Sequence, residues 1–420
     1  MLNNQKKINI FIPIEIKKRE LLSKVILSAF LINNKKKNIR CYVGSKSQIK
    51  KIVFLKKNYG GIFIYKGGLS HNEIKKLKEK INKFIILDEE MGPAINYHLR
   101  KKIVRRIWPG SEKLIDRYYV IGKQASKYAK ETFLKLESRV KITGWPRVDL
   151  WRPKFNCIYK DSVKSLRERY GNFILFSSDF TFISDERINL EKKFWKNSKW
   201  EVMKKNQKKK YIKAKEILYE FQENMKFIRE LDERSDIPQI IIRPHPSEDL
   251  QEWKRINKSL KKIKVVFEGD LTSWINASKG VLHRGSTTSV EAYMKGIPTG
   301  YVVADKKIIK NTLPYRISQH LHNSKQISKF CLNSINKKPV PPKKYSNRFK
   351  NTIHVEKKYA CELISDDIIK LNVERELPSD FSFRRYMIDT FVVNLNNLKS
   401  LIIKILKKYM YKILLPEKIL

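Results

Sequence analysis

Short β-rich runs alternate with helix-patterned segments in two successive series, and this alternation restricts the fold more than any other feature of the sequence. The first series predicts strands at residues 8–14, 39–43, 61–65, 84–87 and 118–121, with helices at 19–32, 72–81 and 124–136 between them. The second series predicts strands at residues 173–177, 239–243, 264–267, 280–283 and 299–303. Strands that alternate with helices form a parallel sheet covered on both faces. We therefore predict an α/β protein with two doubly wound, Rossmann-like domains.

The length of 420 residues fits two domains. Gly144 and Pro146, followed by Pro153, interrupt the pattern and predict an interdomain linker. The expected division is an N-terminal Rossmann-like domain (1–150), a second Rossmann-like domain (151–335) with a helical insertion at 186–234, and a C-terminal extension (336–420). Within the insertion, apolar residues from Tyr211 to Ile228 step by three and four, which predicts an amphipathic helix. This helix is preceded by lysines 204, 205 and 208–210. They are expected either to form a solvated helix face or to contact phosphate groups or anionic lipid.

Lysine and arginine outnumber aspartate and glutamate by 90 to 42, giving a formal charge of +48. Such an excess attracts phosphate-rich partners, although much of it is lysine scattered among Asn and Ile along the whole chain. Residues 391–413 place apolar side chains on one helical stripe with lysines between them. This basic amphipathic helix is expected either to lie on an anionic inner-leaflet membrane surface or to close over a domain core.

The four cysteines stand alone, and no histidine lies at a zinc-ligand spacing from them. This pattern indicates a reduced compartment and no structural metal. The apolar stretch 10–14 is too short for a signal-peptide core. We therefore expect a cytoplasmic protein that meets the inner membrane only peripherally.

The segment 240–248 reads Ile-Ile-Ile-Arg-Pro-His-Pro-Ser-Glu and ends a predicted buried strand. The prolines fix the turn, so Arg243 and His245 are expected at the carboxyl edge of the sheet, where open α/β folds bind ligands. Arginine suits bidentate phosphate contact, and histidine can donate a proton to a leaving group. The alternative for His245 is a loop histidine whose ring is satisfied by nearby backbone.

A second motif follows the predicted strand 280–283, with a hydroxyl cluster that opens a helix. Its candidate phosphate ligands and ribose-facing carboxylate are His283, Arg284, Ser286, Thr287, Thr288 and Glu291. Hydroxyls and backbone N–H groups at a helix start can bind phosphate. The alternative is simple capping, in which Thr288 and Glu291 form a capping box.

Together the two motifs resemble the nucleotide-sugar half of GT-B glycosyltransferases. The resemblance is to bacterial surface carbohydrate biosynthesis proteins and, beyond them, to capsule Kdo transferases, polysialyltransferases and CDP-glycerol transferases. Segments 12–21, 87–90 and 143–149 resemble the same surface-carbohydrate family, so the resemblance covers roughly residues 6–305.

The resemblance implies a glycosyltransferase of GT-B architecture that needs no cofactor besides its nucleotide-sugar substrate. It places His245 at the donor phosphate as a proton donor, with Ser286, Thr287 and Thr288 on the same phosphate and Glu291 facing the ribose or donor sugar. Related enzymes use cytidine nucleotides, which favours a CMP-activated sugar. No Asp-x-Asp metal motif lies near either strand end. Arg243 and Arg284 would therefore neutralise the leaving group in a metal-independent transfer.

A general base must take the proton of the acceptor hydroxyl, and we expect it from the N-terminal domain. Asp88, Glu89 and Glu90 follow the predicted strand 84–87, and adjacent like charges can raise a carboxylate pKa. Glu89 or Glu90 is the favoured base; the alternative is an acidic cluster at a helix N-terminus. Glu15, at the end of the first strand, is a second acceptor-side candidate, with a surface pair to Lys18 or Arg19 as its alternative.

The leading hypothesis is transfer of a sugar to a surface polysaccharide or glycolipid acceptor, lipid-linked at the inner leaflet. A second enzyme hypothesis is a nucleotide-sugar epimerase or hydrolase of the same fold, which releases its product without an acceptor. A basic nucleic-acid-binding protein is motivated by the charge alone, and no zinc finger, helix-turn-helix or RNA-binding motif supports it.

Overall fold

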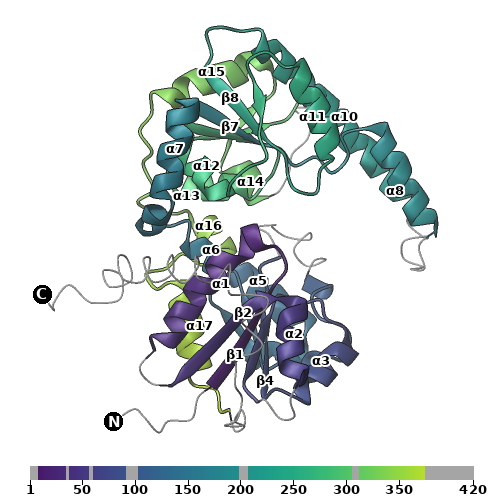
Figure 1. Cartoon of the computed structure of the whole chain (residues 1–420), viewed down its shortest axis with the longest axis vertical. Coiled ribbons are helices and arrows are strands. Elements are labelled where there is room, and N and C mark those ends of the chain that lie inside the picture. Colours follow the sequence, from purple (N-terminus) through teal and green to yellow (C-terminus); the bar gives the residue numbers. More distant parts are fainter. Residues whose placement is uncertain are drawn as a thin grey trace, which may run out of the picture.

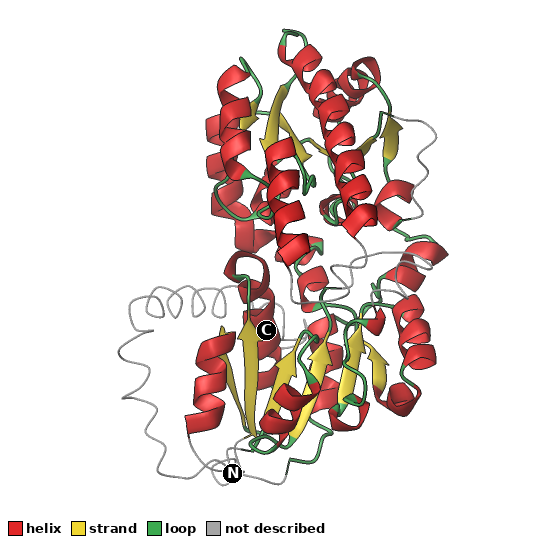
Figure 2. Ribbon diagram, turned by 90° about the vertical axis from the view of Figure 1, so that its right-hand side faces the viewer, coloured by secondary structure: helices red, strands yellow, loops and turns green. Residues whose placement is uncertain are grey.

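The computed structural model describes residues 8–34, 37–55, 60–90, 103–197, 207–304 and 312–373. Two α/β domains lie one above the other, each a central sheet with helices packed around it (Figures 1 and 2). The fold prediction is confirmed for the α/β class and the two Rossmann-like domains. Within these residues, no helix combines the length and apolar character needed to cross a membrane. The predicted basic helix at 391–413 lies outside the described residues.

The strands of the first domain are β1 (Ile8–Ile14), β2 (Ile39–Ser45), β3 (Ile62–Tyr65), β4 (Lys83–Leu87), β5 (Arg117–Val120) and β6 (Val140–Ile142). Its helices are α1 (Lys17–Ile32), α2 (Lys46–Leu55), α3 (His71–Lys78), α5 (Lys123–Thr132) and α6 (Pro146–Asp149), with 3-10 turns η1 (Glu112–Leu114), η2 (Leu134–Arg139) and η3 (Pro153–Tyr159). The strands are parallel in the order β2-β1-β3-β4-β5-β6. The strand order reverses at β1, so the topological switch point lies between β1 and β3.

The strands of the second domain are β7 (Phe173–Ser177), β8 (Gln239–Arg243), β9 (Lys264–Val265), β10 (Gly280–His283), β11 (Thr299–Val302) and β12 (Gln319–Leu321). Its helices are α7 (Lys160–Tyr170), α8 (Asp185–Asn197), α10 (Gln207–Asp232), α11 (Leu250–Ser259), α12 (Leu271–Ala277), α13 (Thr288–Met294), α14 (Leu313–Arg316) and α15 (Ser324–Ile335). The parallel order β12-β11-β10-β7-β8-β9 is the Rossmann arrangement, with its switch point between β7 and β10. Every residue of β7 and β10 is buried, as expected for central strands covered on both faces.

The insertion between β7 and β8 forms α8 and α10, which extend to one side of the second domain (Figure 1). The apolar stripe predicted for the longer helix packs into the domain core, with Ala214, Leu218, Phe221, Met225 and Ile228 buried. Hydrophobic burial along one face therefore anchors α10 to the domain. Lys204 and Lys205 lie outside the described residues.

After α15 the chain returns to the first domain. Helix α16 (Asn347–Thr352) packs against α5, and α17 (Ala360–Ile368) packs against α1 and α6. The Asp149 carboxylate accepts hydrogen bonds from the backbone N–H groups of Ala360 and Cys361, both at 2.9 Å. The described part of the C-terminal extension thus belongs to the first domain's surface layer.

The segment predicted as a linker is tightly packed. Trp145 is fully buried and joins the core cluster of the first domain together with Val148 and Trp151. The same cluster takes in Val290 and Met294 of α13 from the second domain. Figure 1 shows α12, α13 and α14 on the side of the second domain nearest the first. The two domains therefore share an apolar contact beside the chain segment that connects them.

Candidate functional site

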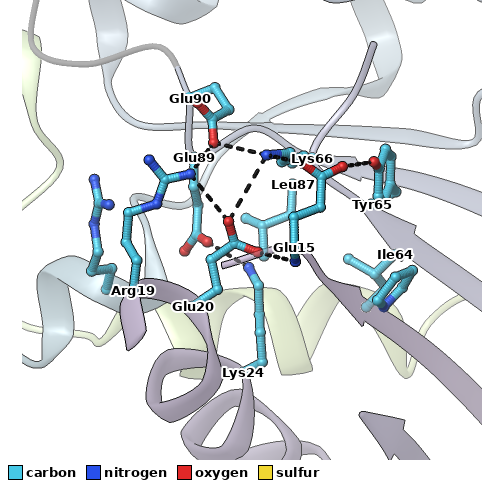
Figure 3. Close-up of a pocket in the computed structure, with 12 residues that line it drawn as sticks. Glu15, Arg19, Glu20, Lys24, Ile64, Tyr65, Lys66, Leu87, Glu89 and Glu90 are labelled. Atoms are coloured by element: carbon cyan, nitrogen blue, oxygen red, sulfur yellow. Dashed lines mark hydrogen bonds and ion pairs between the residues drawn. The ribbon is translucent and has the colours of Figure 1, made fainter. Parts of the chain in front are cut away.

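A small pocket lies at the switch point of the first sheet, beyond the carboxyl ends of β1, β3 and β4 (Figure 3). Open α/β sheets bind their ligands at this position. Charged side chains dominate the lining: Glu15, Arg19, Glu20, Lys24, Lys66, Glu89, Glu90 and Arg147. Two of the predicted acceptor-side residues, Glu89 and Glu90, therefore meet in one pocket with the candidate Glu15.

Lys66 connects the carboxylates of this pocket (Figure 3). Its Nζ lies 2.6 Å from Glu15 and 3.0 Å from Glu90. Arg19 forms ion pairs with Glu90 and, at 3.1 Å, with Glu20. Burial raises the pKa of Glu15 and Glu90, but their cationic neighbours outweigh it, so the pKa of each is lowered. The expected upward shift is therefore wrong for Glu90, which is ionised at neutral pH.

Glu89 carries one paired and one unpaired carboxylate oxygen. Its Oε2 accepts a hydrogen bond of 2.6 Å from Lys24, and both side chains are only 7% exposed. Its Oε1 is buried and has no hydrogen-bond partner in the described structure. Leaving a buried acceptor unpaired costs about 1–3 kcal/mol, so this atom can gain by accepting a bond from a ligand hydroxyl.

Asp88 is fully buried and does not line the pocket. It accepts hydrogen bonds from Arg106 Nε and Tyr118 Oη, both at 3.0 Å, and from the backbone N–H of Glu90 at 3.1 Å. Burial raises its pKa against the opposing charge of Arg106. Asp88 therefore positions the backbone of Glu90 and does not face a ligand.

Arg147 of α6 also lines the pocket. Its guanidinium carbon lies 5.3 Å from the ring centre of Trp145 and 5.7 Å from that of Trp151. Its Nε is buried without a hydrogen-bond partner among the described residues. Burial lowers the pKa of Arg147, while Glu89 of the first domain and Glu291 of the second both raise it. Arg147 thus interacts electrostatically with carboxylates from both domains.

Hydroxyl groups gather at the second switch point, between β7 and β10. Thr288 Oγ1 lies 3.1 Å from Ser177 Oγ and 2.8 Å from Ser286 Oγ. Thr287 occupies the position before α13 and makes no side-chain capping bond. The alternative capping box between Thr288 and Glu291 is therefore absent, and Ser286 and Thr287 remain partly exposed.

The loop after β8 presents His245 to solvent. Its Nδ1 lies 2.7 Å from Ser247 Oγ and accepts the Ser247 backbone N–H at 3.2 Å. This arrangement orients the ring so that Nε2 is available to a ligand. Arg243 instead donates to the backbone carbonyls of Glu268 (2.6 Å) and Gly269 (3.3 Å), and burial lowers its pKa to about 10. Arg243 thus holds the loop before α12.

His283 and Arg284 also make their contacts within the second domain. Burial lowers the pKa of His283 to about 3, so the ring is neutral. Its Nδ1 accepts the Gly285 N–H at 3.0 Å, and its Nε2 lies 2.8 Å from Ser318 Oγ. Arg284 forms an ion pair with Glu220 of α10. Both arginines predicted to neutralise the leaving phosphate therefore have partners within the domain.

Glu291 lies at the domain junction. It is buried, one of its carboxylate oxygens has no hydrogen-bond partner among the described residues, and burial raises its pKa against the charges of Lys295 and Arg147. Lys295, one turn later, donates to Asn156 of η3 at 2.7 Å. The predicted ribose-facing carboxylate thus lies next to the segment that joins the domains.

Sequence reasoning missed Lys24, Lys66 and Glu248. Lysines are so frequent in this chain that Lys24 carries no distinguishing signal, whereas Lys66 directly follows β3 at the sheet edge. Glu248 ends the Arg-Pro-His-Pro segment and accepts bonds from Ser178 Oγ (2.7 Å), Phe180 N (2.6 Å) and Trp253 Nε1 (2.6 Å). Burial raises its pKa to about 7. Glu248 therefore fastens the loop after β7 to the loop after β8.

No family model matches the chain, and no curated protein matches its sequence. Among solved structures, the chain is similar to the UDP-GlcNAc 2-epimerase of Methanocaldococcus jannaschii, with 14% identity, 86% of this chain and 99% of that chain covered, and a TM-score of 0.49. It is also similar to a UDP-bound MnaA of S. aureus, with 14% identity, 87% of this chain and 95% of that chain covered, and a TM-score of 0.48. A variant of the wall teichoic acid polymerase TagF is similar with 10% identity, 86% of this chain and 88% of that chain covered, and a TM-score of 0.49. Likenesses at this level assign no activity.

Proposed function

We propose that this protein is a glycosyltransferase that moves a sugar from a nucleotide-activated donor to a hydroxyl of a surface polysaccharide or glycolipid. The observation that carries the proposal is the position of Arg147, which lines the first-domain pocket in the segment where α13, the helix that bears Glu291, packs against the first domain. A transfer reaction needs two substrates held side by side. Arg147 connects this pocket to the segment where the two domains meet.

The donor is assigned to the second domain. His245, with Nδ1 held by Ser247, presents Nε2 at the carboxyl edge of β8. The Ser286 and Thr287 hydroxyls are partly exposed at the switch point, with Ser177 and Thr288 behind them. These groups are the proposed ligands of the donor phosphate. The resemblance to cytidine-nucleotide enzymes makes a CMP-activated sugar the first donor to test.

The acceptor is assigned to the first-domain pocket. Glu89 Oε1 takes the proton from the acceptor hydroxyl. As the proton leaves, the hydroxyl oxygen of the acceptor bonds to the anomeric carbon of the donor sugar. The bond from the anomeric carbon to the donor phosphate oxygen breaks, its electron pair remains on the phosphate, and His245 donates a proton there. Lys24 stays ion-paired with Glu89 through Oε2 and holds the carboxylate in place.

A thermal-shift screen of the full chain with CMP, CDP, UMP, UDP, GDP and AMP tests the donor assignment. A nucleotide at about a hundred times its dissociation constant should stabilise the fold by roughly 2.7 kcal/mol. We expect selective stabilisation by CMP, lost in His245→Ala and Ser286→Ala. Selective UDP or GDP binding would replace the cytidine assignment, and no response to any nucleotide would overturn the transferase.

Product analysis separates transfer from the other enzyme hypothesis. Incubation with a CMP-activated sugar should release CMP in proportion to the sugar added to an acceptor glycan. Release of a free or epimerised sugar at the same rate without acceptor would instead identify a hydrolase or epimerase.

A further inference from the structure

We propose that Arg147 binds an anionic group of the acceptor, a carboxylate or a phosphate, next to the hydroxyl that reacts at Glu89. This inference rests on the proposed function, whose acceptor class it defines. It assigns to Arg147 a specificity-determining role that is separate from the proton transfer.

Arg147 is held in place by packing and has no close ion-pair partner among the residues that the structure describes. The rings of Trp145 and Trp151 lie 5.3 and 5.7 Å from its guanidinium carbon, and Trp145 is fully buried. Stacking on aromatic faces suits a guanidinium and leaves its N–H edge available for hydrogen bonds. Buried Nε has no acceptor within the described residues. An unsatisfied charged donor in a residue that lines a pocket can bind a ligand anion.

The other cations that line the pocket already have carboxylate partners. Lys24 pairs with Glu89 at 2.6 Å, and Lys66 pairs with Glu90 at 3.0 Å. Arg19 is paired as well. In the described structure Arg147 forms no ion pair within 4 Å with any carboxylate of this lining, so its charge is not neutralised at close range. A ligand anion supplies the missing partner.

Two unpaired atoms of opposite hydrogen-bonding character therefore share one pocket. Arg147 Nε is a donor without an acceptor, and Glu89 Oε1 is an acceptor without a donor. One substrate satisfies both if it carries an anionic group near a hydroxyl. An acidic sugar and a phosphorylated sugar or polyol both have this chemistry, whereas a neutral sugar leaves the charge of Arg147 uncompensated.

Saturation-transfer NMR on the full chain tests the inference with methyl glucuronide, glucose 6-phosphate and methyl glucoside as probes. We expect the wild type to bind at least one anionic probe about tenfold or more tightly than methyl glucoside. A preference for the glucuronide indicates a carboxylate, and a preference for the phosphate indicates a phosphorylated acceptor. Equal binding of all three probes, or no binding of the anionic probes, would overturn the inference.

Arg147→Gln should remove the preference, and Arg147→Lys should restore only part of it because lysine lacks the planar fork. Arg152→Gln is the matched control: this arginine lies five residues later, stacks over Tyr359 at 4.7 Å and does not line the pocket. Arg152→Gln should keep the wild-type preference. An Arg147→Gln protein that keeps it would overturn the inference. The nucleotide screen on the same samples reports the proposed function separately, because its readout is the loss of CMP binding in His245→Ala and Ser286→Ala, two residues that do not line this pocket.

Discussion

The two switch points of this protein use different chemistry. Apart from Arg147, the cations that line the pocket of the first sheet are paired with carboxylates, among them Lys24 with Glu89 and Lys66 with Glu90. At the second switch point the hydroxyls of Ser286 and Thr288 bond to each other, and the buried His283 is neutral. The first site therefore depends on charge balance, whereas the second depends on a hydrogen-bonded loop shape.

Because of this difference, substitutions in the two sites are expected to have different effects on stability and binding. Changing one charged partner in the first site leaves the other charge buried without compensation. Changing a hydroxyl in the second site removes a contact without disturbing a charge.

Glu89→Gln should lower kcat for sugar transfer by about 10²–10⁴-fold, the range that general-base catalysis contributes. The amide cannot take a proton from the acceptor hydroxyl, although it fills the same space. Steady-state kinetics below the unfolding temperature of each variant measures the effect. CMP binding should stay unchanged, since the donor groups lie in the other domain. Glu90→Gln is the control, with a smaller loss because Glu90 is held by Arg19 and Lys66.

Lys24→Met should destabilise the first domain by about 3–5 kcal/mol. The substitution leaves the Glu89 carboxylate, only 7% exposed, without its cation. The double variant Lys24→Met with Glu89→Gln removes both charges and should recover most of the loss. Urea unfolding of the three proteins measures this. Additive losses in the double variant would show that the pair is not coupled and would remove the charge-balance description of this site.

Glu248→Gln should remove a pH dependence from the second domain. Burial raises the pKa of Glu248 to about 7 from its ordinary value of 4.5, so the native state keeps this proton longer than the unfolded state. The contribution to stability is therefore present below pH 4.5 and lost as pH rises to 7, on the order of 3 kcal/mol in all.

Urea unfolding at pH 5 and pH 8 tests this, with the difference between wild type and Glu248→Gln isolating the one group. His283 acts in the opposite direction, because its lowered pKa reduces stability as pH falls from 6.5 toward 3. Its contribution is common to both proteins and cancels in the difference. Identical pH responses in the two proteins would show that Glu248 is not the titrating group.

The sequence predicted the strand framework well because buried parallel strands are continuous apolar runs. The predicted strands at 8–14, 173–177, 239–243 and 280–283 coincide with β1, β7, β8 and β10. Since side chains after parallel strands meet at one sheet edge, placing the strands also placed Glu15 and Glu90 in one pocket. The short strands β6 and β12 were missed because three residues carry too little pattern.

The partners of the charged residues could not be predicted. Glu89 pairs with a lysine 65 positions earlier, and Arg284 pairs with a glutamate 64 positions earlier in the insertion. Such contacts depend on how helices lie over a sheet, which local sequence patterns do not specify. For this reason Arg243 and Arg284 were assigned to a phosphate, whereas each is bonded within its own domain.

Glu220→Gln gives the smallest effect and tests whether the insertion supports the donor loop. Glu220 of α10 pairs with Arg284, which also donates to the Asp179 carbonyl at 3.0 Å and directly precedes the loop that carries Ser286. Weakening this partly buried pair should cost about 1–2 kcal/mol of stability and reduce nucleotide affinity several-fold. Thermal unfolding and nucleotide titration measure the two effects.

Glu223→Gln is the matched control, one turn away on the same helix. Its carboxylate lies 2.6 Å from Nζ of Lys226, whose side chain is 63% exposed, so solvent screens this surface pair. The control should therefore bind nucleotide like the wild type. Equal nucleotide affinity in both variants would show that the donor loop keeps its shape without α10. The second site would then be a property of the sheet edge alone, and the contrast between the two switch points would be sharper.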